Sequence, residues 1–344
     1  MTAAATPIRR LPRSAARKPL RLGFLGVGWI GRHRMRALLH SGRAEAVGIV
    51  DPSAECRQAA LAEAPGAIAA ADLEELLRLG LDGIVIATPS AQHAAQAIRA
   101  LEAGLAVFCQ KPLGRTAAEA AAVVEAARRA DRLLAVDLSY RFTTAMAAIK
   151  ALVERGDLGP VFAADLVFHN AYGPDKAWFY DPAEAGGGCV MDLGVHLVDL
   201  ALWCLDFPSV AGVESDLFCG GAQLTIPGGR AEDFATATLR LETGAMVRIA
   251  CSWRLHAGRD ADISATFYGP CGGASMRNLD GSFYDFTAVR LRGTSQEALV
   301  TPPDDWGGRA AVDWAARLAG GDRFDPSAEH LVHVAAVLDR IYGR

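Results

Sequence analysis

The sequence has little that would indicate a membrane, nucleic-acid-binding or disulfide-stabilised protein. No apolar run approaches the roughly 18 residues that a membrane-spanning helix needs, and a net charge of −4 gives no basic field for nucleic acid. The seven cysteines contain no C-x-x-C pair and no zinc-like spacing, so we expect reduced thiols and no metal site. These absences leave a small molecule as the expected partner, with no nucleic acid and no membrane.

The first 19 residues, MTAAATPIRRLPRSAARKP, lack the apolar core of roughly 7–15 residues that a secretion signal requires. We expect them to form a disordered tail on a cytoplasmic protein, although the Arg9–Arg10 pair leaves a twin-arginine signal as a remote alternative. At the usual size of roughly 150 residues per domain, the length of the chain predicts two domains.

Two patterns of β-type runs divide the rest of the chain near residue 150. From residue 20 to 150, short apolar runs alternate with alanine-rich helical stretches: LRLGFLG, AVGIVD, DGIVIATP, LAVFCQ and LLAVD. This alternation predicts a Rossmann-like parallel sheet wound on both faces by helices. From 151 to 344, longer runs alternate with period two, as in DFATATLRLE and DADISATFYG, which predicts an antiparallel sheet. Helices are expected over 191–203 and 327–343, with the last one returning to pack between the domains.

A glycine motif, GVGWIG, stands between the first predicted strand and the first predicted helix. In that context Gly26 would make the tight turn, Gly28 would admit a pyrophosphate, and Gly31 would let helix and strand pack closely. The amides of Trp29 and Ile30 belong to the same helix N-terminus, which suits an anion. The motif therefore predicts a dinucleotide-binding loop.

A carboxylate, Asp51, ends the second strand 20 residues after Gly31, the spacing expected for a residue that binds the adenosine ribose. A 2′-phosphate there would meet like charge, at a cost of up to about 4 kcal/mol at 4 Å. The sequence therefore favours NAD, with NADP left open because Arg57, Arg32 or Arg34 could accept a phosphate. Asp51 could also cap the helix that follows.

Polar residues follow two further strands at the edge where the ligand crevice of such a sheet lies. Thr88 and Pro89 end one strand, and Gln110 and Lys111 end the next, in FCQKPLGRT. All four are predicted to line the cofactor site. His93, in the first turn of the next helix, is a further cofactor-binding candidate, although a plain polar residue is the more economical interpretation.

One predicted helix, within GGGCVMDLGVHLVDLALW, carries polar residues at Asp192, His196 and Asp199. At 100° per residue these three share one face, and the preceding glycines would let the backbone approach a ligand closely. Asp199 would hold His196 or a backbone amide. A zinc site of Asp192, His196 and Cys189 is conceivable, but this spacing is poor evidence of metal.

Taken in order, GVGWIG, ATPSAQHAAQAIRALEAGLAVFCQKPL, SYRF and GGGCVMDLGVHLVD resemble the Gfo/Idh/MocA oxidoreductase family over residues 20 to 340. The resemblance implies an N-terminal Rossmann domain and a C-terminal α/β domain with a large, mostly antiparallel sheet. It implies an NAD(P)-dependent dehydrogenase that oxidises a hydroxyl of a sugar or polyol. It also implies a homodimer or homotetramer, because members often pair through the exposed face of the second sheet.

The resemblance further assigns roles to single residues. Lys111 matches the motif lysine, Asp192 the active-site aspartate and His196 the histidine, which we expect to be the general base. Arg141 and Phe142 match a segment beside the cleft, and Arg141 is carried forward as a substrate-binding candidate. Aromatic and imidazole side chains give weaker candidates for the substrate wall: Tyr172, Trp178 and His256.

One departure from the family pattern is Gln110, where a glutamate usually precedes the Lys-Pro pair; it removes a charge beside Lys111. Two alternatives to a simple dehydrogenase stay open, and Gln110 bears on the second of them. One is a lyase or glycosidase that retains NAD and uses transient oxidation. The other is a non-catalytic sugar sensor that binds nucleotide.

Overall fold

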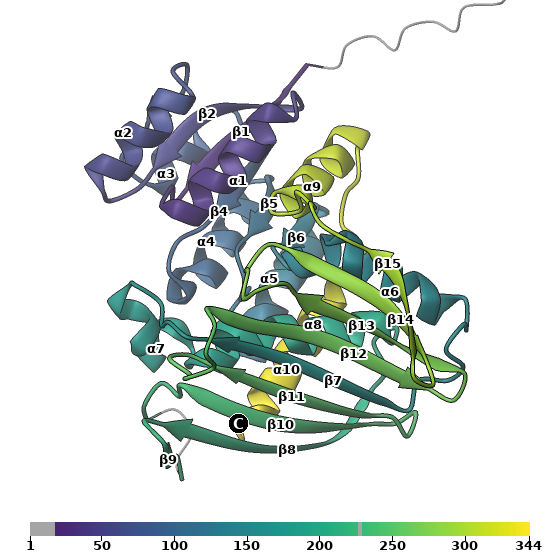
Figure 1. Cartoon of the computed structure of the whole chain (residues 1–344). Coiled ribbons are helices and arrows are strands. Elements are labelled where there is room, and N and C mark those ends of the chain that lie inside the picture. The colour runs from purple at the N-terminus through teal and green to yellow at the C-terminus, as the bar shows by residue number, and fades with distance from the viewer. Residues whose placement is uncertain (1–17, 226–228) are drawn as a thin grey trace, which may run out of the picture.

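The structure is a computed structural model that describes residues 18–225 and 229–344. It contains two sheets, each covered by helices, stacked one above the other in Figure 1. The tail predicted at 1–19 lies outside the described residues except for Lys18 and Pro19.

The first sheet is parallel, with strand order β3-β2-β1-β4-β5-β6. Its strands are β1 (Leu20–Leu25), β2 (Ala44–Val50), β3 (Ile68–Ala69), β4 (Gly83–Ile86), β5 (Ala106–Cys109) and β6 (Leu134–Val136). The connecting helices are α1 (Trp29–His40), α2 (Ala54–Glu63), α3 (Leu73–Leu77), α4 (Ser90–Glu102) and α5 (Ala117–Ala130). β4 and β5 are buried along their whole length, as expected of central strands covered on both faces. The doubly wound sheet predicted from the sequence is confirmed.

The second sheet has strand order β15-β14-β13-β12-β7-β11-β10-β8-β9. Its strands are β7 (Ala163–Asn170), β8 (Val210–Cys219), β9 (Ala222–Gln223), β10 (Phe234–Leu241), β11 (Met246–Ser252), β12 (Ala261–Gly269), β13 (Gly272–Asn278), β14 (Phe286–Arg292) and β15 (Ser295–Val300). β7 and β11 run parallel, and the other described pairs are antiparallel. Buried and less buried residues alternate along β10, which fits a sheet with one covered face. The large, mostly antiparallel sheet is confirmed.

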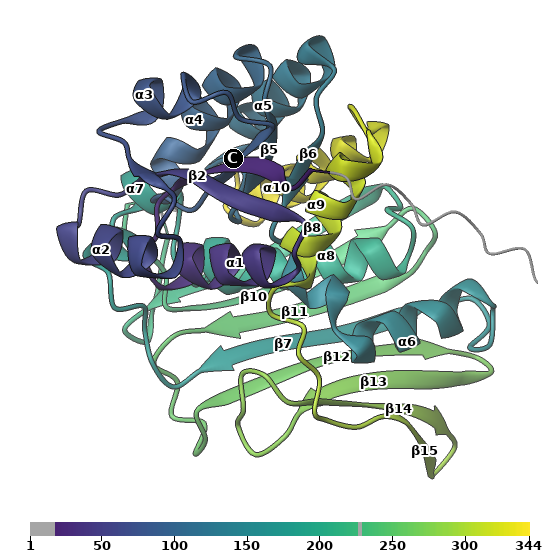
Figure 2. The same cartoon turned by 90° about the horizontal axis from the view of Figure 1, so that it is seen from above.

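Helices join the two sheets. Contacts place α6 (Thr144–Glu154) on β13, β14 and β15, and α8 (Val195–Cys204) on β7 and β11. The last helix, α10 (Glu329–Ile341), contacts both α5 of the first layer and α8 of the second, and in the view from above in Figure 2 the first sheet partly covers it. The boundary placed at residue 150 from the sequence falls inside α6.

One returning helix was not anticipated. α9 (Arg309–Gly320) packs against α1 and β5 of the first sheet, far from its neighbours in sequence. Its Trp314 is fully buried beside Phe108, with ring centroids 5.7 Å apart. A Cβ added at Gly83 would lie 2.9 Å from the indole, so glycine in β4 makes room for this side chain.

The helical stretch Pro182–Cys204 differs from the expectation that no membrane-length apolar segment is present. Within the described part of the chain it is long and apolar enough, by length and composition, to cross a membrane. However, 89% of its most apolar window is buried inside the protein. It comprises α7 (Pro182–Ala185), the π-helical turn η3 (Val190–Gly194) and α8, and it serves as the core helix under the second sheet.

Candidate active site

A cleft of about 510 Å³ lies at the carboxyl ends of the parallel strands, between the two sheets. Residues from both parts of the chain line it, which is the position expected of a ligand crevice in an open α/β sheet. It brings together most of the side chains selected from the sequence: Gly28, Trp29, Ile30, Thr88, Pro89, His93, Gln110, Lys111, Trp178, Asp192 and His196.

The glycine loop has the local geometry that a dinucleotide needs. Gly26 has a φ of +86°, and a Cβ there would lie 2.5 Å from the carbonyl oxygen of Ala87. A Cβ on Gly28 would meet nothing within 4 Å, so the space over the loop is open and a ligand can approach the backbone there. A Cβ on Gly31 would lie 2.1 Å from the oxygen of Gly26, so helix and loop could not approach as they do. α1 has no side-chain cap and no acid in its first turn, which leaves its amides for an anion.

The carboxylate of Asp51 holds this loop in place. Its Oδ2 accepts a hydrogen bond from the amide of Val27 at 2.8 Å, and its Oδ1 accepts from the amide of Ser53 at 2.9 Å. Ser53, rather than Asp51, caps α2 through the amide of Cys56. The guanidinium of Arg57 folds back and donates to the main-chain oxygen of Asp51. Asp51 therefore fixes the turn between Gly26 and Gly28, and it can do so whether or not it also binds the cofactor.

His93 is buried between the segments that follow β4 and β5 and contacts both of them. Its Nδ1 lies 2.7 Å from the carbonyl oxygen of Pro112, and its Nε2 lies 2.7 Å from that of Thr88. Burial lowers the pKa of His93, the charge on Lys111 lowers it further, and the two carbonyls oppose the shift. The ring thus ties the segment containing Lys111 to the neighbouring strand end.

Gln110 belongs to a buried polar cluster. Its Nε2 donates to Oδ2 of Asp137 at 2.5 Å, and the same oxygen accepts from Nε of Arg34 at 2.5 Å. Arg34 also donates to the hydroxyl of Ser139 at 3.3 Å. Because Arg34 and Asp137 are almost completely buried, they neutralise each other inside the cleft wall. The neutral amide of Gln110 fits this cluster, since a carboxylate there would face Asp137.

Lys111 and Asp192 form an ion pair between the two halves of the protein. The Nζ of Lys111 lies 2.6 Å from Oδ1 of Asp192 and 2.7 Å from its main-chain oxygen. The indole of Trp253 donates to Oδ2 at 3.0 Å. The two side chains are only 19% and 15% exposed, so water screens the pair weakly. Lys111 follows β5 and Asp192 lies in η3, so the pair also fixes the mouth of the cleft.

His196 lines the same cleft, and its ring lies edge-on to Tyr140 with centroids 4.9 Å apart. Within the described residues its Nδ1 is buried without a hydrogen-bond partner, so Nε2 is the nitrogen that a ligand can reach. Burial holds the pKa of His196 well below its usual value of 6.5, and the charges of Lys111 and Arg34 lower it further. The imidazole is therefore neutral at pH 7.

Two expectations about neighbouring side chains differ from the structure. Asp199 does not hold His196: its Oδ2 accepts from Nε of Arg141 at 2.7 Å in a two-pronged pair. The guanidinium of Arg141 lies over the ring of Phe207 at 5.3 Å, away from the cleft. Both Asp199 and His196 lie in the regular helix α8, so helical phase is not the reason; a buried carboxylate is stabilised more by a guanidinium than by a neutral imidazole.

Of the three weaker candidates for the substrate wall, only Trp178 lines the cleft. Trp178 lines the cleft and stacks on Phe179 with centroids 3.8 Å apart. Tyr172 instead is 56% exposed and donates its hydroxyl to Asp260 at 2.6 Å, outside the cleft. His256 is exposed and does not line the cleft. No three His, Cys, Asp or Glu side chains in the described part of the chain come together as a metal site.

The glycines before the helix are needed for close packing against other parts of the protein. A Cβ on Gly187 would lie 2.0 Å from the hydroxyl of Tyr342, and one on Gly188 would lie 2.0 Å from the main-chain oxygen of Glu232. The buried carboxylate of Glu232 accepts from the amides of Gly188 and Val190 at 2.9 Å. It also accepts from the hydroxyl of Tyr342 at 2.8 Å. Glu232 thus fixes the entrance to the helix of Asp192, and no local sequence signal marked it.

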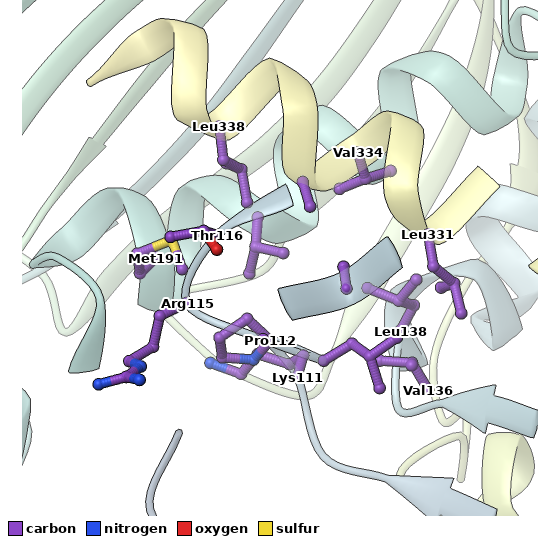
Figure 3. Close-up of a pocket in the computed structure, with 15 residues that line it drawn as sticks. Lys111, Pro112, Arg115, Thr116, Val136, Leu138, Met191, Leu331, Val334 and Leu338 are labelled. Carbon is purple, nitrogen blue, oxygen red and sulfur yellow. The ribbon is translucent and has the colours of Figure 1, made fainter. Parts of the chain in front are cut away.

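The segment that carries Lys111 is supported from the side away from the cleft. Figure 3 shows Leu331, Val334 and Leu338 of α10 facing the chain from Lys111 to Thr116 across an apolar cavity of about 20 Å³. Such packing leaves little room for this segment to shift.

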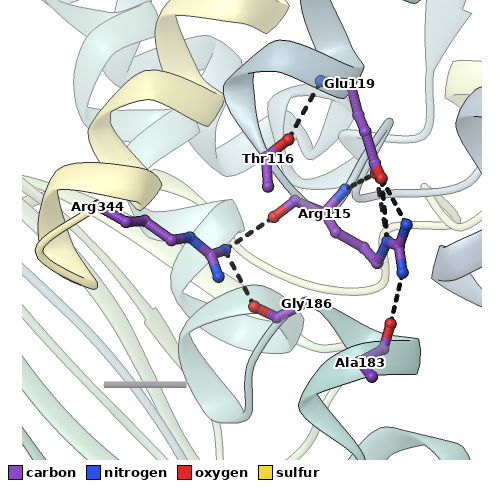
Figure 4. A network of polar contacts seen from close by, with 6 residues as sticks. All are labelled: Arg115, Thr116, Glu119, Ala183, Gly186 and Arg344. Carbon is purple, nitrogen blue, oxygen red and sulfur yellow. Dashed lines mark hydrogen bonds and ion pairs between the residues drawn. The ribbon is translucent and has the colours of Figure 1, made fainter. Parts of the chain in front are cut away.

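Polar contacts extend the same support (Figure 4). The Nη2 of Arg344 donates to the carbonyl oxygens of Arg115 at 2.8 Å and Gly186 at 3.0 Å. Arg115 in turn pairs with Glu119 and donates to the carbonyl of Ala183. The loop after Lys111 and the loop before Asp192 are therefore tied to each other directly.

Comparison with known proteins gives two family matches. Residues 20–138 match the oxidoreductase family with an NAD-binding Rossmann fold, and residues 146–275 match the GFO/IDH/MocA C-terminal domain. A putative UDP-kanosamine synthase oxidoreductase subunit of Amycolatopsis mediterranei is 31% identical over 259 residues, covering 71% of each chain. The D-glucoside 3-dehydrogenase of Escherichia coli is 27% identical over 272 residues, covering 75% of this chain and 77% of the relative.

Solved structures share the fold over nearly the whole chain. Levoglucosan dehydrogenase in complex with NADH has a TM-score of 0.80 at 21% identity, covering 95% of this chain and 96% of the other. An aldose-aldose oxidoreductase from Caulobacter crescentus, complexed with glycerol, has a TM-score of 0.82 at 20% identity, covering 95% and 97%. At these identities the similarity shows the fold and not the substrate.

Proposed function

The chain belongs to the Gfo/Idh/MocA family of NAD-binding oxidoreductases, and from that premise we propose that it oxidises a hydroxyl of a sugar or polyol with His196 as general base. The observation that carries the proposal is the convergence of three groups on one cleft. The glycine loop lies on one side, the Lys111–Asp192 pair crosses the cleft, and the neutral imidazole of His196 lines it.

The cofactor site fits a dinucleotide on local geometry. The uncapped start of α1 and the open space over Gly28 suit the pyrophosphate, and Thr88 and Pro89 line the next strand end. When bound, NAD supplies the acceptor for the hydride that leaves the carbinol carbon. Gln110 and Lys111 end β5 in the same cleft and would hold the nicotinamide end. We propose NAD rather than NADP because the carboxylate of Asp51 would face a 2′-phosphate.

The proton of the reacting hydroxyl passes to Nε2 of His196. A neutral imidazole can accept it at pH 7, and proton transfer of this kind contributes roughly 10²- to 10⁴-fold. The ammonium of Lys111, held by Asp192, donates a hydrogen bond to the reacting oxygen and stabilises the negative charge that develops on it. Asp192 keeps Lys111 in this position and contacts a neighbouring substrate hydroxyl.

The experiment is a panel of sugars, polyols and their methyl glycosides assayed for NADH formation with NAD and with NADP. Wild-type protein should oxidise at least one compound, and His196→Gln should lower kcat by about 10² or more. The matched control is His169→Gln: this histidine lies in β7, bonds Ser252 at 2.8 Å and does not line the cleft. NADH fluorescence should show that both variants still bind the nucleotide within about threefold.

The outcomes separate the alternatives. Unchanged turnover in His196→Gln would remove the histidine from the role of base. Nucleotide binding with bond cleavage and no release of NADH would favour a lyase or glycosidase that retains its cofactor. Binding of sugar and nucleotide without any chemistry would favour a sensor.

The assembly and the location of the protein are also proposals. We infer a homodimer or homotetramer in the cytoplasm, formed through the face of the second sheet that α6, α8 and α10 do not cover. A monomeric mass in light scattering would contradict the assembly.

A further inference from the structure

Charge in the cleft is balanced. Three Lys or Arg side chains of the described chain line it, and each has a carboxylate partner: Arg34 with Asp137 at 2.5 Å, Lys111 with Asp192 at 2.6 Å, and Lys176 with Asp175 at 3.2 Å. An anionic substrate such as a sugar acid or sugar phosphate would meet no cation among the described residues of the cleft whose charge is not already balanced by a carboxylate. Freeing one of the two innermost cations for it would cost roughly 3–5 kcal/mol, because those pairs are buried. The cleft therefore suits an uncharged substrate.

Aromatic side chains dominate the same cleft. Eight of its 33 lining residues are Trp, Tyr or Phe, about a quarter, whereas aromatic residues make up 7% of the whole chain. A site for a small polyol alone needs hydrogen-bonding groups more than aromatic faces. One of the eight, Trp29, belongs to the cofactor loop; the other seven come from segments after residue 139, and they indicate that part of the substrate is apolar.

One wall of the cleft runs from the cofactor loop to the second sheet and is formed by Trp29, His33, Gly307, Trp306 and Tyr284. Trp29 stacks on His33 with centroids 6.0 Å apart, and Gly307 packs so closely on His33 that an added Cβ would lie 3.0 Å from its ring. The adjacent Trp306 donates its indole N–H to the carbonyl oxygen of Tyr284 at 2.9 Å. The wall thus crosses between the two parts of the chain.

The two ends of this wall are exposed. Trp29 is 66% exposed and Tyr284 is 53% exposed, although both line the cleft. Trp29 belongs to the cofactor loop, so its exposed face is available to the nucleotide, whereas the exposed face of Tyr284 is available to the substrate. The stacked pair Trp178 and Phe179, in the 3₁₀ turn Ala177–Tyr180 that follows β7, adds a second aromatic surface to the same cleft.

We propose that the substrate is an uncharged glycoside whose aglycone carries an apolar ring, which lies against Tyr284 and Trp178 while the sugar reaches Lys111 and His196. This inference rests on the proposed function, and it narrows the substrate class. The rings contribute to substrate affinity and take no part in the chemical step.

The test compares matched methyl and phenyl glycosides of D-glucose, D-galactose, D-mannose and D-xylose, in both anomers, by NADH formation. For the sugar that reacts, the phenyl glycoside should have a kcat/KM at least tenfold higher, mainly through a lower KM. The corresponding uronide and 6-phosphate should react at least tenfold more slowly than the neutral glycoside. Tyr284→Ala and Trp178→Ala should each reduce the preference for phenyl over methyl at least threefold.

The control variant is Phe162→Ala. Phe162 is a 58% exposed aromatic residue beside the opposite end of β7, and it does not line the cleft, so this change should leave the preference as it is. Equal rates for methyl and phenyl glycosides would overturn this inference and leave the dehydrogenase intact. No NADH from any glycoside, sugar or polyol would overturn the proposed function itself. A preference that survives both cleft variants would overturn the assignment to these two rings.

Discussion

Replacing Lys111 by methionine should destabilise the protein by about 3 kcal/mol, because it leaves the carboxylate of Asp192 without its cation. At the observed separation of 2.6 Å, the attraction between the two charges is about 6 kcal/mol at an effective dielectric of 20. Desolvation offsets part of this attraction, and removing one partner of a buried pair typically costs roughly 3–5 kcal/mol. The partial exposure of both side chains places the expected value at the lower end.

The corresponding change in melting temperature follows from the size of the chain. A 344-residue protein has an unfolding entropy of about 0.7 kcal/mol/K at roughly 2.1 cal/mol/K per residue, so 3 kcal/mol lowers Tm by about 4 °C. Differential scanning fluorimetry of the ligand-free protein measures it. Adding Asp192→Asn to Lys111→Met should lower Tm little further, because the second change removes the carboxylate charge that the first one left without a partner.

A double-mutant cycle isolates the pair. The Lys111/Asp192 cycle should give a coupling of about 1.5 kcal/mol or more. The Arg248/Asp165 cycle is the control, because that pair has similar distances of 2.6 and 2.7 Å but an arginine that is 64% exposed. Exposed pairs of this kind contribute about 0.2–1 kcal/mol. A Lys111/Asp192 coupling no larger than that of the control would refute the reasoning that burial makes this pair strong.

Three further predictions concern the proton, the supporting carboxylate and the cofactor. Because the pKa of His196 lies well below 6.5, the imidazole stays neutral as the pH falls towards 6. The value of kcat/KM at pH 6 should therefore be within twofold of its value at pH 7.5. A loss of kcat/KM that begins above pH 6.5 would contradict the lowered pKa of the base. Glu232→Gln should lower Tm by about 3 °C, equivalent to roughly 2 kcal/mol, because Oε1 accepts from Val190 and Tyr342, so the new amide N–H₂ would replace Oε2 and face the N–H of Gly188. The value of kcat should fall more than the affinity for NADH, and an unchanged Tm would show that these bonds do not hold the loop. Asp51→Asn keeps an acceptor for the amide of Val27 and removes the charge, so the ratio of kcat/KM for NAD to that for NADP should fall at least tenfold; an unchanged ratio would place the 2′-position away from Asp51.

Local signals in the sequence predicted the first sheet and its glycine loop well. The apolar runs ending at Leu25, Val50, Ile86, Cys109 and Val136 became its main strands, because buried parallel strands leave a continuous apolar pattern. The turn at Gly26–Gly31 depends on contacts within a few residues of the loop and on one neighbouring strand, so its geometry follows from the motif.

Features that depend on contacts distant in sequence could not be predicted in the same way. Glu232 reaches Gly188 across 44 positions, and no spacing rule joins them. Asp199 pairs with Arg141 across 58 positions and not with His196 on its own helix, because a guanidinium that only the fold brings near is a stronger partner for a buried carboxylate than a neutral imidazole. The position of the last helix at the end of the chain predicted that it would pack at the domain junction. No feature of the sequence predicted that α9 would return to the first sheet.

The cleft wall from Trp29 to Tyr284 illustrates the limit for the site itself. Trp29 was selected as part of the glycine motif, whereas Tyr284 and Trp306 lie in segments with no recognisable motif. Their meeting at one cleft depends on how the second sheet sits over the first, with Gly307 against His33. Composition showed few aromatic residues, and only the fold shows that eight of them share one cleft.

The most direct test of the central claim follows the hydrogen atom itself. Glycosides, sugars and polyols fully deuterated on carbon would be incubated with the protein and NAD, and the reduced nucleotide would be examined by mass spectrometry. The account predicts one deuterium in each NADH formed, at a rate that falls at least a hundredfold in His196→Gln. NADH without deuterium, or glycoside cleavage with no NADH released, would contradict direct oxidation of a substrate hydroxyl at this site.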